Sequence, residues 1–338
     1  MSRRVRLGLQ VIIGLVSLVV PGLLARHLGL PAAAPVLSLA SLAALVACVR
    51  VGWRQALGGG AALALLSVPA VLSQNDVVAA TALMAMTAVL LGLAVRWQQQ
   101  PAYWLLGVSL IMVLTTLPLP QPVPAGLLAR LAGLLLLSCT LTTLVQGWFM
   151  TLVPANAQPA MAVQHSWRRS LAYGALLAVT ALLTTPIALA HHWHTTGLWL
   201  ILTPFLVLRP YVKEGWKPTL HRSLGSIAGV LLVHLLALAL PPALPLQIPA
   251  IALGLVTVLV AIRHGHPALF VLLLTATIVL FNSHDGTLLL MADKRLQANA
   301  IGIAIAIGVM ALADPVERAL LQRQRTAHLQ RPSARHWR

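Results

Sequence analysis

The sequence predicts an all-α, polytopic membrane protein with about 12 transmembrane helices in two tandem six-helix repeats. Of its 338 residues, 59% are hydrophobic and only 9% are charged. Aqueous domains carry about 25% charged residues, so this chain cannot cover itself with polar surface in water. The apolar residues also form runs close to the roughly 20 residues that cross the core of a bilayer. Landmark residues of the first half recur in the second half, which indicates a duplication.

The apolar runs divide into two groups of six, separated by a polar stretch at residues 151–169 that we interpret as a cytoplasmic linker. The predicted spans of the first group are Leu7–Ala25, Pro35–Val49, Gln55–Leu72, Val77–Val95, Tyr103–Leu117 and Gly126–Val145. Those of the second group are Ser170–Ala190, Gly197–Leu208, Thr219–Leu240, Leu246–Ile262, Ala268–Phe281 and Leu288–Ala313. Several runs are short, so ten or eleven spans are also compatible with the pattern.

The basic residues predict the orientation of these spans. Lys and Arg are retained on the cytoplasmic side of membrane proteins. With the amino terminus inside, most of the basic residues fall on that side, including Arg3, Arg168, Arg209 and the tail at residues 315–338. We therefore expect both termini in the cytoplasm of a bacterial cell, at its inner membrane. The basic start also resembles a signal peptide, but the many further spans favour an uncleaved first helix.

Several landmarks recur in the same order. Arg3 and Arg168, Pro21 and Pro186, His27 and His192, and Arg130 and Arg295 are each 165 residues apart. The short sequence GWRQAL is also followed by GWKPTL, and PAYWLL by PALFVL, at nearly the same spacing. The expected organisation is one repeat at residues 1–150 and a second at residues 170–314. With an even number of spans in each, the repeats share one orientation, as in parallel-repeat transporters.

Composition and motifs also exclude several functions. The net charge is +17, but the charges stand singly between apolar runs, so we expect no nucleic-acid binding. The sequence contains no P-loop, nucleophile elbow, HExxH or CxxC motif, so we expect no enzyme and no cofactor or metal. Both cysteines lie in apolar runs, where they act as small packing residues. Transport by this chain would therefore use an ion gradient or the energy of a partner.

Two stretches of the second half carry a family resemblance. They are GLWLILTPFLVLRP and LHRSLGSIAGVLL, and a third element, RLQANAIG, lies in the last span. Together they resemble the fusaric acid resistance (FUSC) family of bacterial inner-membrane proteins, which includes aromatic acid exporters. The family's usual acid–Thr pair is replaced in the third element by Ala298 and Asn299. The chain also lacks the large cytoplasmic domains of many members, so it resembles a compact, membrane-only branch.

The resemblance implies an exporter of small organic anions, such as aromatic carboxylic acids, working with a periplasmic membrane-fusion subunit and the proton gradient. Candidate substrate-binding residues are Arg222, Arg295, Arg130 and Trp199, because a guanidinium group binds a carboxylate through two hydrogen bonds. Asp293 is the candidate for proton coupling, since burial raises the pKa of a carboxyl group. Small residues at helical spacing predict close helix packing at Gly225, Ser226, Gly229 and Gly302.

Alternatives to these assignments remain open. Arg130 and Arg295 can also extend towards lipid headgroups, and Asp293 can instead form an ion pair with Arg295. A scaffold protein that transports nothing is the main functional alternative, and an enzyme acting on a lipid-linked substrate is a second. The sequence leaves the substrate, the coupling ion and the oligomeric state open, a homo-oligomer included.

Overall fold

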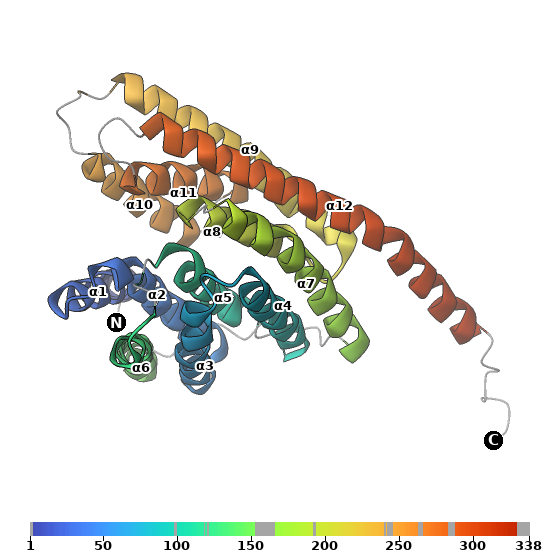
Figure 1. Cartoon of the computed structure of the whole chain (residues 1–338), viewed down its shortest axis with the longest axis horizontal. Coiled ribbons are helices and arrows are strands. Elements are labelled where there is room, and N and C mark those ends of the chain that lie inside the picture. The colour runs from blue at the N-terminus through green and yellow to red at the C-terminus, as the bar shows by residue number, and fades with distance from the viewer. Residues whose placement is uncertain are drawn as a thin grey trace. The chain divides into compact units, whose positions relative to one another are not determined.

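A computed structural model describes residues 3–97, 100–117, 119, 122–152, 166–191, 194–239, 241, 246–262, 266–282 and 288–329. Over these residues the chain is helical and has no strand, which confirms the all-α fold class (Figure 1). The chain divides into two compact units, Met1–Leu202 and Thr203–Arg338. Most of the predicted linker at residues 151–169, and the end of the tail, lie outside the described residues.

The first unit contains the longer series of helices. They are α1 (Arg3–His27), η1 (Pro31–Ala33), α2 (Ala34–Val51), α3 (Trp53–Leu72), α4 (Val77–Ala94), η2 (Val95–Trp97), α5 (Gln100–Thr116), α6 (Ala125–Leu152) and α7 (Trp167–Ala190). Local chemistry sets several boundaries. The side chain of Asp76 accepts hydrogen bonds from the first turn of α4, and Ser166 caps α7 in the same way. Gly52 separates α2 from α3 at a φ of 94°, a conformation that favours glycine.

The second unit is built from the remaining helices. The unit boundary falls within α8 (His194–Val207), and α9 (Val212–Ala239), α10 (Gln247–Ile262), α11 (Pro267–Asn282) and α12 (Leu288–Leu329) follow. Within this unit α9 packs against both α11 and α12, and α10 packs against α11. Helix α12 continues past the predicted span end at Ala313, and an ion pair between Asp314 and Arg318 joins adjacent turns of the extension.

Seven helices of the described chain are long and apolar enough to cross a membrane. They contain the segments Pro31–Val49, Trp53–Leu72, Val77–Ala94, Ala125–Phe149, Trp167–Ala190, Glu214–Ala239 and Leu288–Pro315. Shorter apolar helices, such as Gly107–Thr116 and Pro267–Leu280, lie between them. The chain is therefore a membrane protein with several spanning helices, whereas the predicted total of about 12 spans and the two six-helix repeats remain predictions.

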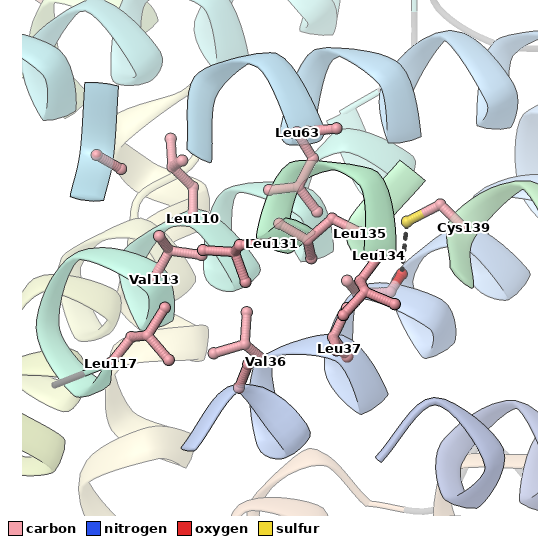
Figure 2. Packing of buried hydrophobic residues seen from close by; sticks show 14 of the residues in the cluster. Val36, Leu37, Leu63, Leu110, Val113, Leu117, Leu131, Leu134, Leu135 and Cys139 are labelled. Atoms are coloured by element: carbon pink, nitrogen blue, oxygen red, sulfur yellow. Dashed lines mark hydrogen bonds between the residues drawn. The ribbon is translucent and has the colours of Figure 1, made fainter. Parts of the chain in front are cut away.

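A leucine-rich core holds the first unit together. Figure 2 shows side chains of α2, α3, α5 and α6 meeting in this cluster, among them Leu37, Leu63, Leu110 and Leu135. At its edge the thiol of Cys139 donates a long hydrogen bond of 3.6 Å to the carbonyl oxygen of Ala40. The cysteine therefore acts within the packing of α2 and α6, as the sequence predicts.

Helices α4 and α7 approach each other through two glycines. A Cβ atom added at Gly92 would overlap the backbone of Gly174 and lie 3.1 Å from the carbonyl oxygen of Ser170. Small residues at such a crossing let two helix backbones come into contact, which is a main source of packing energy inside a bilayer. No larger side chain fits here without separating the two helices.

We expect Gly92→Ala to destabilise the protein by about 1–3 kcal/mol, because the added methyl group has no space between α4 and α7. The matched control is Gly133→Ala in α6, where an added Cβ meets nothing within 4 Å. Thermal unfolding of the detergent-solubilised variants measures the effect. Equal unfolding temperatures for the two variants would contradict the packing of α4 on α7.

Candidate functional site

Two arginines are buried inside the second unit. Arg222 in α9 is 5% exposed, and Arg295 in α12 is 4% exposed. The helices that carry them lie side by side (Figure 1). Arg222 donates a hydrogen bond to Asn299, which lies one turn after Arg295 in α12, so the two like charges lie near each other. The second unit therefore holds two cations of like sign away from solvent, an arrangement that is costly inside a membrane.

Neutral polar side chains surround Arg222. Its Nε and Nη2 atoms donate hydrogen bonds to the hydroxyl of Thr203 in α8, at 3.3 and 3.1 Å. Nη2 also donates to the amide oxygen of Asn299 in α12, at 3.4 Å. The hydroxyl of Thr203 donates to the same amide oxygen at 2.8 Å, and the amide nitrogen of Asn299 donates to Ser226 at 3.2 Å. Helices α8, α9 and α12 are thus joined by one hydrogen-bonded network.

Arg295 extends this cluster towards α11. Its Nη2 atom donates a long hydrogen bond of 3.5 Å to the hydroxyl of Thr275. Arg295 lies one helical turn before Asn299 in α12, so both side chains occupy the same face of that helix. We call these six side chains, from Thr203, Arg222, Ser226, Thr275, Arg295 and Asn299, the arginine cluster.

The glycines of α9 place Arg222 by letting α9 approach α11. A Cβ atom at Gly225 would lie 2.6 Å from the carbonyl oxygen of Ala268, and one at Gly229 would lie 2.7 Å from that of Leu272. Gly225 follows Arg222 by about one helical turn, so the position of the arginine depends on this contact. Gly302 is buried in α12.

The other candidate residues lie apart from this cluster or outside the second unit. Arg130 is exposed on α6 of the first unit. Trp199 is buried in α8, one turn before Thr203. Asp293 is exposed on α12, although it precedes the buried Arg295 by only two residues. Of the four candidate substrate-binding residues, the structure therefore brings together Arg222 and Arg295.

Sequence reasoning did not assign a role to three members of the cluster. Thr203 was noted only as part of a motif, and Asn299 only as a departure from the family pattern. Both prove to be direct partners of Arg222. Thr275 carried no signal, because a single threonine in an apolar run also forms hydrogen bonds within its own helix. Polar residues of apolar spans that share a helix face with an arginine would have been the useful signal.

The arrangement is suited to binding an anion. In the part of the chain that the structure describes, no three His, Cys, Asp or Glu side chains come together to hold a metal ion. His221 and His266 form an edge-to-face pair with ring centroids 4.9 Å apart, but His192 and His264 of the histidine-rich loops lie outside the described residues. Two buried cations with hydroxyl and amide neighbours are instead groups of the kind that bind carboxylates.

Comparison with known families agrees with the motifs that form this cluster. Residues 160–309 match the family of fusaric acid resistance protein-like proteins. The matched segment includes every member of the arginine cluster, and it confirms the FUSC resemblance predicted from the sequence. No curated protein and no solved structure matches the chain. The FUSC match suggests a role in membrane transport or resistance.

We expect Gly225→Ala to lower the stability of the FUSC-like segment by about 1–3 kcal/mol, because its Cβ would push α9 away from α11. Gly308→Ala is the matched control in α12, since an added Cβ there meets nothing within 4 Å. Thermal unfolding in detergent compares the two. An unchanged midpoint for Gly225→Ala would show that the close contact between α9 and α11 does not hold Arg222 in place.

Proposed function

We propose that this protein exports small organic anions, such as aromatic carboxylic acids, across the inner membrane of a bacterium, driven by the proton gradient. The observation that carries the proposal is the pair of buried guanidinium groups on α9 and α12. The FUSC match supports a general role in transport or resistance. A periplasmic membrane-fusion subunit is the expected partner of such an exporter.

The energetics of the bilayer support a functional reason for these arginines. A charged side chain within the membrane costs a few kcal/mol or more, so charges placed there are usually used. Two like charges in one cluster add mutual repulsion to that cost. A bound carboxylate offsets both terms, because it accepts charge-assisted hydrogen bonds and lies between the repelling groups. Substrate binding would therefore relieve the repulsion between the two guanidinium groups.

We expect Arg222→Gln and Arg295→Gln each to lower the rate of export of an aromatic acid. Each variant removes charge-assisted hydrogen bonds worth about 1.5–3 kcal/mol, which corresponds to roughly 10–100-fold in affinity. Arg54→Gln is the control, because Arg54 is exposed and stacks over Trp53 in the first unit. Labelled benzoate moving into inverted membrane vesicles under an imposed pH gradient gives the rate.

The scaffold alternative predicts the opposite result for these variants. A protein that transports nothing would tolerate both arginine-to-glutamine changes, while its glycine contacts would stay sensitive. Failure of wild-type vesicles to move any of a panel of aromatic acids would therefore favour the scaffold over the exporter.

Asp293 is exposed rather than buried, so its proposed proton-coupling role rests on its place two residues before Arg295 in α12. We expect Asp293→Asn to abolish the acceleration of export by a pH gradient. Exchange of benzoate across vesicles without a gradient should continue in the variant, because the arginine cluster is intact. Comparing the two assays separates coupling from binding. Equal stimulation by the gradient in the variant and the wild type would assign the proton to another group.

A further inference from the structure

The side-chain amide of Asn299 is the central contact of the arginine cluster. It is 1% exposed. Its oxygen accepts hydrogen bonds from Thr203 and Arg222, and its nitrogen donates to Ser226. These partners come from α8 and α9, so one amide of α12 links three helices of the second unit. No other side chain among the cluster contacts described above has as many partners within the cluster.

The hydrogen bonds around Asn299 run in one direction. A guanidinium group donates hydrogen bonds and accepts none, so the amide oxygen must face Arg222 and the NH₂ group must face Ser226. Thr203 already accepts from Arg222, and it therefore donates its own hydroxyl proton to Asn299. The order of donation is Arg222 to Thr203, Thr203 to Asn299, and Asn299 to Ser226. Such a chain polarises each bond in turn and fixes its members in place.

Asn299 fixes Arg222 without changing its charge. The Nε and Nη2 atoms of the arginine are held by Thr203 and Asn299, both of them neutral. An aspartate at position 299 would have nearly the same shape and would accept from the same donors. It would also form a charge-assisted bond with Arg222 and compete with any other anion for that guanidinium. Substitutions at position 299 can therefore separate the orientation of Arg222 from the charge placed beside it.

We propose that Asn299 is a positioning and specificity-determining residue, which orients Arg222 through an uncharged contact and adds no negative charge that would compete with a substrate carboxylate. The inference rests on the proposed function, because it treats the arginine cluster as the substrate site. It goes further by assigning the selection of anions to an uncharged side chain. The neutral amide at position 299 is, on this view, required for the site to attract an external carboxylate.

The test compares Asn299→Asp with Asn299→Ala in purified full-length protein, reconstituted in nanodiscs of phosphatidylcholine. Titration calorimetry with benzoate measures binding, and thermal unfolding measures stability. We expect the aspartate variant to bind benzoate about tenfold or more weakly than the wild type, and more weakly than the alanine variant. We also expect the aspartate variant to be the more stable of the two, because it still accepts hydrogen bonds from Thr203 and Arg222 and leaves no cavity.

The aspartate variant is expected to bind benzoate more weakly than the alanine variant but to be the more stable of the two. These opposite rankings in affinity and stability separate the proposed role from a structural one. If Asn299 only held the helices together, alanine would be the more damaging change in both assays. Thr257→Val is the control, since Thr257 lies in α10 and its hydroxyl contacts Leu253 and Thr277 rather than the cluster. Its affinity for benzoate should equal that of the wild type.

Each outcome decides one of the two proposals. Binding of benzoate by the aspartate variant as tight as by the alanine variant, or no binding by the wild type, overturns the role of Asn299. Benzoate transport is measured separately in proteoliposomes with a pH gradient. The expected order of affinities without any gradient-driven transport would overturn the exporter and leave Asn299 as the residue that sets anion binding.

Discussion

The second unit depends on keeping two repelling guanidinium groups buried between its helices. Charges in the interior of a membrane protein are tolerated where polar groups replace water around them. Here the replacement consists of two threonines, a serine and an asparagine, which come from α8, α9, α11 and α12. The polar residues of this unit are therefore concentrated where the charges lie, and their spacing along α9 and α12 follows from that need.

Helix α9 packs against two helices, α11 and α12, with different faces. Gly225 and Gly229 give it a surface without side chains, against which α11 packs at backbone distance. Arg222 and Ser226, one turn apart, contact α12 through Asn299. A larger residue at either glycine would move the polar face together with the apolar one. The glycines and the arginine of this motif are thus parts of a single geometric requirement.

The sequence predicted the membrane class and the approximate helix positions, and it singled out Arg222 and Arg295, which are both buried in the second unit. Composition and apolar run length sufficed for the helices, because spans in a bilayer must satisfy their own backbone hydrogen bonds. Predicted ends agree closely for some helices, such as Leu72 for α3 and Ala190 for α7, and differ where polar turns extend a helix, as in α12 beyond Ala313.

The partners of the arginines were much harder to predict. Duplication suggested that Arg295 corresponds to Arg130, whereas its close neighbour within the second unit is Arg222. The contact joins residues 73 positions apart, which no local pattern reveals. Asn299 was treated as a loss of the family pattern, because a substitution seen in isolation carries no information about the three groups it touches. Its amide becomes a central contact because α12 packs on α9 and because the hydroxyl of Thr203 in α8 reaches both Arg222 and Asn299.

The one-way order of the bonds around Arg222 has a consequence for energy conversion. A relay for H⁺ needs groups that both take up and release a proton, and it must reset after each passage. The guanidinium group of Arg222, which begins this chain of hydrogen bonds, releases no proton at physiological pH. The amide of Asn299 in its middle takes up no proton. The hydrogen-bonded chain from Arg222 through Thr203 and Asn299 to Ser226 is therefore no relay for protons, and the proposed exporter needs a separate route for the coupled proton.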